Sequence, residues 1–185
     1  MLPVFFAVEQ LVIGGTGFDT STSIDIDASQ AQVWDAVVGM TDIVEKPSLP
    51  FRLGVSYPIG AKLSGKGVDA MRFGRFSTGT AIERISVWEP SREITFEVLS
   101  EPAGMREMSP YEHVHAPHVN GYFTTRSVSF RMEPLPNGRA RLELASTHEL
   151  KLEPRVYWMT FANWIVKENG DRVLRHIKEQ AEQIR

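Results

Sequence analysis

The sequence has no cysteine among its 185 residues. This absence excludes a disulfide scaffold, a thiol nucleophile, a zinc finger with cysteine ligands and an iron–sulfur cluster held by cysteines. A surplus of positive charge is also missing, because 23 acidic residues outnumber 20 basic ones and the formal net charge is -3. Nucleic-acid-binding proteins show a basic surplus or stripe, so we expect no nucleic-acid partner. The chain length corresponds to one domain with a single core.

Hydrophobic runs stay shorter than the roughly 20 apolar residues that a membrane-spanning helix needs. Residues 1–13 (MLPVFFAVEQLVI) are mostly apolar, but they include Glu9 and are followed by two glycines. The run has no basic start and no small-residue cleavage site, so it is a poor signal peptide. We therefore separate an N-terminal apolar segment, residues 1–17, from a single domain, residues 18–185. The segment either packs on the domain, is the stub of a membrane segment, or anchors the chain at a membrane interface.

Complete nucleotide-binding motifs are absent as well. Residues 11–18 (LVIGGTGF) look like the start of a dinucleotide-binding fingerprint, but Thr20 stands where the third glycine belongs. An alternating pattern follows, instead of the helix that the motif requires. Residues 65–67 (GKG) lack the spacing and the hydroxyl residue of a phosphate-binding loop. The sequence therefore predicts no cofactor.

What the sequence does contain is a series of strand patterns between two helical regions. Residues 23–28 alternate polar and apolar, which predicts a strand. Ser29 and Gln32 form a capping box that starts a helix, and at most a short second helix fits within residues 41–50. Short turns between the later strands indicate antiparallel pairing. These strands are predicted at residues 61–67, 70–77, 80–88, 93–99, 122–133 and 139–152.

After Pro154 the apolar residues recur at helical spacing. The pattern predicts either one long C-terminal helix or two helices that meet at Asn169 and Gly170, since a glycine inside a helix costs about 1 kcal/mol. The fold class is therefore α+β, in the order strand, helix, short helix, about six strands, long helix.

This order resembles the START-like, or SRPBCC, superfamily, which includes the birch-pollen-allergen fold and the polyketide cyclase/dehydrase proteins. The resemblance implies a helix-grip fold, in which a curved antiparallel sheet of about seven strands wraps around the long C-terminal helix. It also implies a cavity between sheet and helix for an apolar or amphipathic small molecule such as a lipid. The match is carried by VWDAV (33–37), GVDAMRF (67–73), ERISVWEPSREITFEV (83–98), the hairpin at 135–141 and VLRHIKEQAE (173–182).

Two polar residues interrupt rows of apolar residues on the last two strands. Arg126 is the one charge among the even positions of residues 122–132, and His148 lies among the leucines of residues 142–152. A three-residue turn at Pro136, Asn137 and Gly138 would pair Leu135 with Arg139. Along the two strands, the numbers of any two residues that lie opposite each other would then add up to 274. This register predicts that Arg126 and His148 are cross-strand neighbours whose side chains enter the same enclosed space.

A buried Arg126 needs an anionic partner. Glu83 would supply it as an internal ion pair, or a carboxylate or phenolate of a ligand would supply it instead. Arg75 is a weaker candidate of the same kind. The ligand-binding candidates are Arg126, His148, Glu83, Arg75, Tyr122, Phe130, Leu144 and Ile165.

Residues 101–121 form a long loop, and long loops inside compact domains are often lids. Met105 and Met108 would give such a lid an adaptable apolar underside. His113, His115 and His118 would instead suit zinc or iron if Pro117 bends the chain so that they converge. Because their spacing matches no specific metal signature, we favour the lid and predict no metal.

The first hypothesis is a protein that binds a hydrophobic or amphipathic molecule in this cavity without catalysing a reaction. The alternative is a cyclase- or dehydrase-like enzyme in which His148 acts as general acid–base and Arg126 stabilises an enolate. A third class is an interaction or membrane-tethered module, which would need residues 1–13 to lie exposed or to continue upstream. We expect a cytoplasmic monomer or weak homodimer, attached to a membrane only if that segment is a tether.

Overall fold

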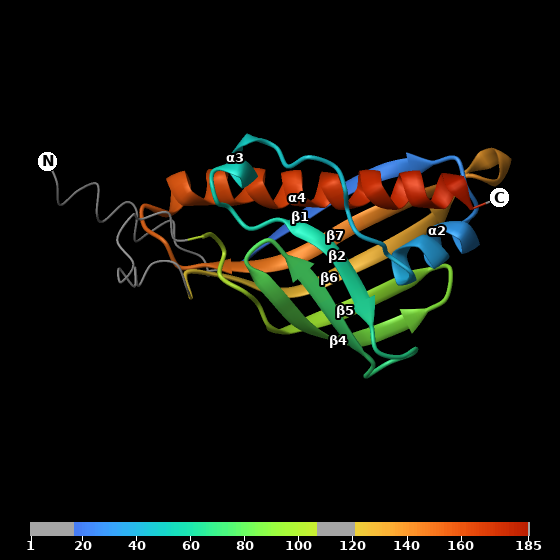
Figure 1. Cartoon of the computed structure of the whole chain (residues 1–185), viewed down its shortest axis with the longest axis horizontal. Helices are drawn as coiled ribbons and strands as arrows, with labels where there is room; N and C mark the ends of the chain where they lie inside the picture. Colours follow the sequence, from blue (N-terminus) through green and yellow to red (C-terminus); the bar gives the residue numbers. More distant parts are fainter. Residues whose placement is uncertain (1–16, 107–120, 185) are drawn as a thin grey trace, which may run out of the picture.

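The computed structural model describes residues 17–106 and 121–184. A seven-stranded antiparallel sheet curls around one long helix (Figure 1), in the strand order β1-β7-β6-β5-β4-β3-β2. The strands are β1 (Gly17–Ile26), β2 (Pro58–Leu63), β3 (Met71–Phe76), β4 (Gly79–Glu89), β5 (Glu93–Ser100), β6 (Phe123–Pro134) and β7 (Ala140–Leu150). The helices are α2 (Gln30–Val38), α3 (Leu49–Arg52), the 3-10 turn η2 (Pro136–Gly138) and α4 (Arg155–Gln183). The predicted α+β helix-grip fold is confirmed.

Helix α2 starts at the predicted capping box. The Gln32 amide donates to Ser29 Oγ at 3.4 Å, and the Gln32 side-chain oxygen accepts from the Ser29 amide at 2.9 Å. These two bonds satisfy backbone and side-chain groups that the first helical turn would leave unpaired. The helix ends at Gly39, whose amide donates to the Asp35 carbonyl.

Helix α4 is one continuous helix of 29 residues that runs through Asn169 and Gly170. Gly170 is buried where the helix crosses the sheet. A Cβ atom at this position would lie 2.9 Å from Thr22 Cγ2 and 3.3 Å from Leu144 Cδ2. The glycine therefore allows α4 to approach β1 and β7 closely, which explains its place inside a helix. Within the described residues, no helix has the length and apolarity that crossing a membrane requires.

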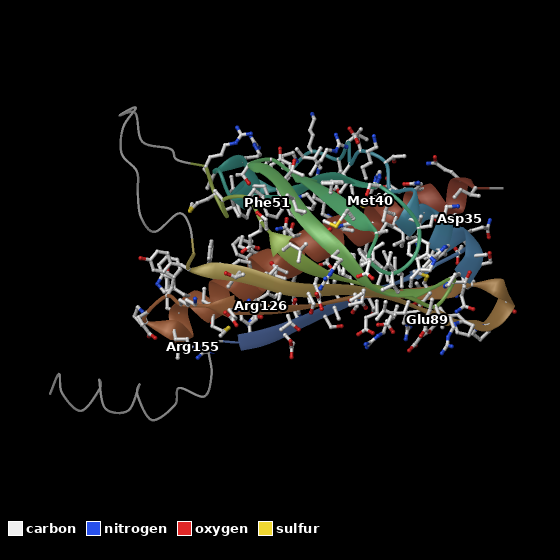
Figure 2. All side chains as sticks on the ribbon, turned by 90° about the horizontal axis from the view of Figure 1, so that it is seen from below. Asp35, Met40, Phe51, Glu89, Arg126 and Arg155 are labelled. Atoms are coloured by element: carbon white, nitrogen blue, oxygen red, sulfur yellow. The ribbon has the colours of Figure 1, made fainter. Side chains whose placement is uncertain are left out.

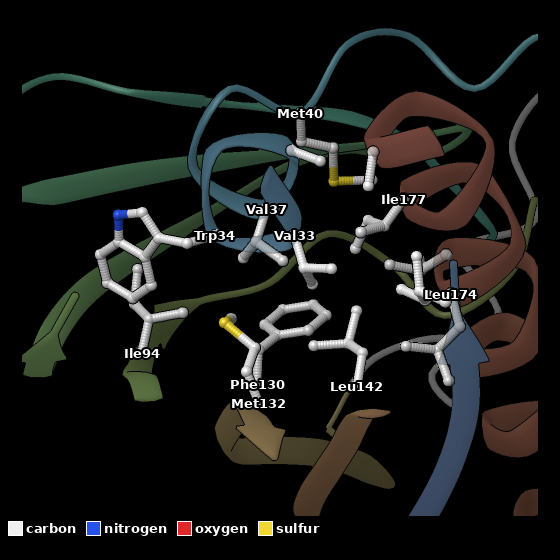
Figure 3. Packing of buried hydrophobic residues seen from close by; sticks show 14 of the residues in the cluster. Val33, Trp34, Val37, Met40, Ile94, Phe130, Met132, Leu142, Leu174 and Ile177 are labelled. Atoms are coloured by element: carbon white, nitrogen blue, oxygen red, sulfur yellow. The ribbon is translucent and has the colours of Figure 1, made fainter. Parts of the chain in front are cut away.

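The solid part of the core lies toward the C-terminal end of α4. Side chains from α2, α4 and the sheet interdigitate there (Figure 3), and Val33, Leu142 and Ile177 are fully buried. The buried residues of α4 are concentrated in its second half. Its first half leaves Tyr157 and Trp164 more than half exposed. The molecule is therefore tightly packed at one end of α4 and less filled at the other.

The turn between β6 and β7 has the predicted geometry. The Leu135 amide donates to the Arg139 carbonyl at 2.9 Å. Asn137 and Gly138 both have positive φ, at 64° and 74°, which suits asparagine and glycine. As the turn predicts, Met132 lies opposite Leu142 and Phe130 opposite Leu144.

Candidate functional site

A cavity of about 350 Å³ lies between the inner face of the sheet and the first half of α4. Its volume is within the range of small-molecule sites. The walls are mostly apolar, and the apolar side chains include Phe96, Val98, Phe123, Val128, Phe130, Leu144, Leu150, Trp158, Ile165 and Val173. Polar groups occupy a few positions, chiefly Arg72, Glu83, Glu101, Thr125, Ser146, His148 and Asn169.

Most of the residues predicted to bind a ligand line this cavity. They are His148, Glu83, Tyr122, Phe130, Leu144 and Ile165, and Met105 of the predicted lid joins them. Arg126 and Arg75 are not part of the lining. Met108, His113, His115 and His118 lie outside the described residues. No cluster of three potential metal-ligating side chains occurs within residues 17–106 and 121–184.

The predicted pairing of Arg126 with His148 is wrong. The register holds from Pro134 to Ser127 and then shifts by one residue, so that Thr125 lies opposite His148. A β-bulge at Arg126 inserts one extra residue into β6, which reverses the faces of the residues beyond it. The Arg126 side chain is 59% exposed and donates to Glu149 Oε2 at 2.8 Å. Figure 2 labels Arg126 on β6, toward the end of the molecule where α4 begins.

The proposed partners of the other charged candidates also need correction. Glu83 forms its ion pair with Arg72, its cross-strand neighbour on β3, and not with Arg126. Arg75 is exposed and pairs with Asp42. Arg75 is therefore not a cavity residue, and Arg72 and Gly74 of β3 line the cavity instead.

Arg72 and Glu83 form a nearly buried ion pair in the cavity wall, with exposed side-chain fractions of 11% and 5%. The Arg72 guanidinium also lies over the Phe96 ring, 4.3 Å from its centroid. A Cβ at Gly74 would come within 3.2 Å of Glu83 Oε1, so the glycine makes room for the carboxylate. Burial raises the pKa of Glu83, while the Arg72 charge and hydrogen bond oppose that rise. The pair therefore compensates its own charge.

His148 is buried in the cavity wall between two phenylalanines. Its ring stacks on Phe123 at 5.1 Å between centroids and lies 5.2 Å from Phe18 at a tilt of 34°. Burial lowers the pKa of His148 to about 4, and the Asp19 charge opposes this shift. The imidazole is therefore neutral at pH 7.

Three hydroxyl groups surround the His148 ring. Ser146 Oγ lies 2.7 Å from Nε2, and Thr125 Oγ1 lies 3.2 Å from Nδ1. Thr20 Oγ1 lies 2.9 Å from Ser146 Oγ, so β1, β6 and β7 all contribute. We call Thr20, Thr125, Ser146 and His148 the histidine network.

Glu101 extends this network at the end of β5. Its carboxylate accepts from the Thr125 amide at 3.1 Å. Burial raises the pKa of Glu101, while hydrogen bonds from the Thr125 amide and hydroxyl, and the nearby Arg126 charge, oppose the rise. Glu101 therefore contacts the network through the backbone amide of Thr125, whose hydroxyl lies next to the His148 ring.

Sequence reasoning missed Arg72, Thr20, Thr125 and Ser146. Ser146 shares the inner face of β7 with His148, and that alternation was visible in the sequence. Thr125 becomes an inner residue only through the bulge. The signal for the bulge was Arg126 itself, because an unpaired charge in an apolar row is costly enough to break the alternation.

Comparisons with known proteins bear on the fold. No protein-family model matches the chain, and no curated protein matches it. The Zhui aromatase/cyclase of Streptomyces sp. R1128 has a similar structure, with a TM-score of 0.59 and 14% identity over 90% of this chain and 94% of that one. Ara h 8.0201 gives a TM-score of 0.53 and 12% identity over 89% and 97% of the two chains. The protein XoxI of Bacillus cereus gives a TM-score of 0.52 and 16% identity over 90% of this chain and 96% of that one. Because these identities are low, the similarity establishes the START-like fold alone.

Proposed function

We propose that this protein of START-like fold binds an apolar or amphipathic small molecule in the cavity beneath α4. The observation that carries the proposal is a mostly apolar cavity of about 350 Å³ with the histidine network set into one wall. Apolar walls favour a hydrophobic ligand by about 25 cal/mol for each Å² of apolar surface removed from water. A few polar groups among them fix the orientation of the ligand.

The charged groups support binding without catalysis. The cationic residue that the enzyme hypothesis requires, Arg126, lies outside the cavity. Arg72 does line the cavity, but Glu83 already neutralises it. An enolate or phenolate intermediate would therefore find no uncompensated cation among the described lining residues.

A cyclase- or dehydrase-like enzyme remains the second candidate, because one observation favours it. His148 is neutral and lines the cavity, as a general base must. In that role Nε2 would take a proton from a bound substrate after displacing Ser146. Loss of product formation in His148→Gln, with ligand affinity retained, would favour this candidate over simple binding.

The experiment for the binding function blocks the cavity. Ala162 lines the cavity from α4, so Ala162→Phe places a ring inside it. Thr160→Phe adds the same ring at an exposed position of the same helix and serves as the matched control. We expect the neutral dye N-phenyl-1-naphthylamine to bind the native protein and the control, and to bind Ala162→Phe at least about tenfold more weakly, because the ring removes its site.

Native mass spectrometry of protein purified from its source gives an independent readout. We expect a noncovalent small molecule to copurify with the native protein and to be lost from Ala162→Phe. Equal dye binding by both phenylalanine variants, or no dye binding by the native protein, would contradict the proposed function.

A further inference from the structure

We propose that the first half of α4 docks on the surface of a lipid bilayer through three exposed aromatic side chains, Tyr157, Phe161 and Trp164. We call these three residues the aromatic row. The inference goes beyond the proposed function, because it concerns the outer surface of the helix and holds whether or not the cavity binds a ligand.

The aromatic row lies along one side of α4. Its members are separated by four and then three residues, a spacing that places side chains on the same side of a helix. Tyr157 is 66% exposed, Trp164 51% and Phe161 40%. Large rings that stay in water forgo the stabilisation that burial would give them. A continuous row of them therefore indicates a surface that a partner covers.

The rings of the row form a chain of contacts that reaches the cavity. Phe161 lies 5.9 Å from Trp164 between ring centroids, and Trp158 lies 5.2 Å from Tyr157 and 6.2 Å from Phe161. Trp158 and Phe161 also line the cavity. The apolar surface of the cavity wall therefore continues onto the outside of α4.

A second apolar feature meets the domain beside the same turn of helix. The Arg155 guanidinium donates to the Gly17 carbonyl at 3.5 Å, so β1 begins next to the first turn of α4. Residues 1–13, which precede β1, are mostly apolar. A protein partner would need a surface shaped to both features, whereas a bilayer takes up apolar side chains without shape complementarity. This proximity favours a bilayer as the partner.

The residue types of the row also favour a bilayer. Tryptophan and tyrosine join an apolar ring to a polar N–H or O–H group, and they are enriched where hydrocarbon meets water. The exposed Lys151 and Lys167 flank the row in sequence, and long lysine side chains can extend toward lipid headgroups. Glu153 and Glu168 offset these charges. We therefore expect apolar insertion, and not attraction to anionic lipids, to drive docking.

Flotation of the full chain with vesicles of phosphatidylcholine tests the surface. Tyr157→Ser combined with Trp164→Ser removes the two most exposed rings of the row. We expect the native chain to float with the vesicles and this double variant to partition onto them at least about tenfold less, because two rings no longer leave water. Neither residue lines the cavity, so the double variant should keep its fold and its dye binding.

The matched control is Val44→Ser combined with Val68→Ser, which removes two exposed apolar side chains at other places. Val44 precedes Glu45, which pairs with Arg175 in the second half of α4, and Val68 lies between β2 and β3. This control should float like the native chain. Equal flotation of the native chain and the Tyr157→Ser, Trp164→Ser variant would overturn the proposal. So would flotation of the native chain only with vesicles that contain phosphatidylserine.

Tryptophan fluorescence separates docking by the row from attachment by residues 1–13 alone. Trp164→Phe keeps a ring in the row and should still float. With brominated phosphatidylcholine, which quenches tryptophans that reach the lipid, we expect this variant to lose part of the quenching seen in the native chain. Flotation with equal quenching of both proteins would mean that Trp164 stays in water, and would overturn the proposal.

Light scattering in the absence of lipid tests the other occupant, a second copy of the chain. A native dimer that Tyr157→Ser with Trp164→Ser converts to a monomer, together with no flotation, would assign the aromatic row to self-association and overturn the proposal. The dye experiment is independent of these outcomes. Failure of flotation leaves the binding function intact, and failure of dye binding leaves the docking surface intact.

Discussion

At the scale of single residues, buried polar groups are balanced by partners close in space. Glu83 has Arg72, and the imidazole of His148 has hydroxyl groups at both nitrogens. Such groups are costly to bury alone. Their pKa values shift in the directions that burial dictates, upward for Glu83 and downward for His148.

The lowered pKa of His148 predicts a loss of stability in acid. The unfolded chain takes up a proton on this imidazole as the pH falls below about 6.5, whereas the native protein does so only near pH 4. Between these values the unfolded state binds more protons, so stability falls as the pH is lowered. The full effect is about 3 kcal/mol, from about 1.36 kcal/mol for each pH unit.

Urea unfolding at pH 7 and at pH 4.5 measures this effect. We expect His148→Gln to lose less stability on acidification than the native protein, by about 2 to 3 kcal/mol. The prediction fails if His148→Gln and the native protein lose equal stability.

At the scale of elements, the crossing of α4 over β1 and β7 depends on a missing side chain. Gly170 lies against Thr22 and Leu144, with no room for a Cβ atom. Thr22 cannot easily turn away, because its hydroxyl donates to Asp171 Oδ1 on the same helix. The helix and the sheet are therefore in close contact, with little room to adjust, at Gly170 near the middle of α4.

Gly170→Ala separates helix propensity from packing. Alanine would favour the helix by about 1 kcal/mol, but overpacking against Thr22 costs about 1 to 3 kcal/mol or more. We expect net destabilisation in thermal or urea unfolding. Adding Thr22→Ser, which removes the contacting methyl group and keeps the hydroxyl, should restore stability. A single Gly170→Ala variant more stable than the native protein would show that the contact relaxes freely.

At the scale of the whole molecule, the two halves of α4 have different roles. The second half packs with α2 and the sheet into a filled core (Figure 3), while the first half forms the roof of the cavity. Stability should therefore be concentrated at one end of the molecule and binding at the other.

Two truncations on the same helix test this division. Leu174→Ala removes a fully buried core side chain and should cost about 2 to 5 kcal/mol. Ile165→Ala shortens a side chain that faces the cavity, and should cost less than about 2 kcal/mol because fewer packing contacts are lost. Urea unfolding of both variants gives the comparison. Equal costs would mean that the first half of α4 is packed as firmly as the second.

The sequence by itself determined the features that depend on neighbouring residues. The capping box at Ser29 and Gln32, the turn at Asn137 and Gly138, and the change to helical periodicity after Pro154 all appear where the pattern placed them. The order of these elements carried the resemblance to the START-like superfamily, and that resemblance implied the helix-grip fold. Local hydrogen bonding and backbone preference decide such features, and both can be read from a few adjacent residues.

The tertiary structure alone decided which polar side chains face the cavity. Because of the bulge at Arg126, Thr125 lines the cavity and Arg126 does not. On β3, Arg72 lines the cavity and Arg75 does not. The histidine network joins residues of three strands that are up to 128 positions apart in the chain. Alternation along a strand is lost after one inserted residue, and the choice between two registers depends on burial against partners distant in sequence. For that reason the cavity could be expected from the sequence, but its hydrogen-bonding chemistry came from the three-dimensional arrangement.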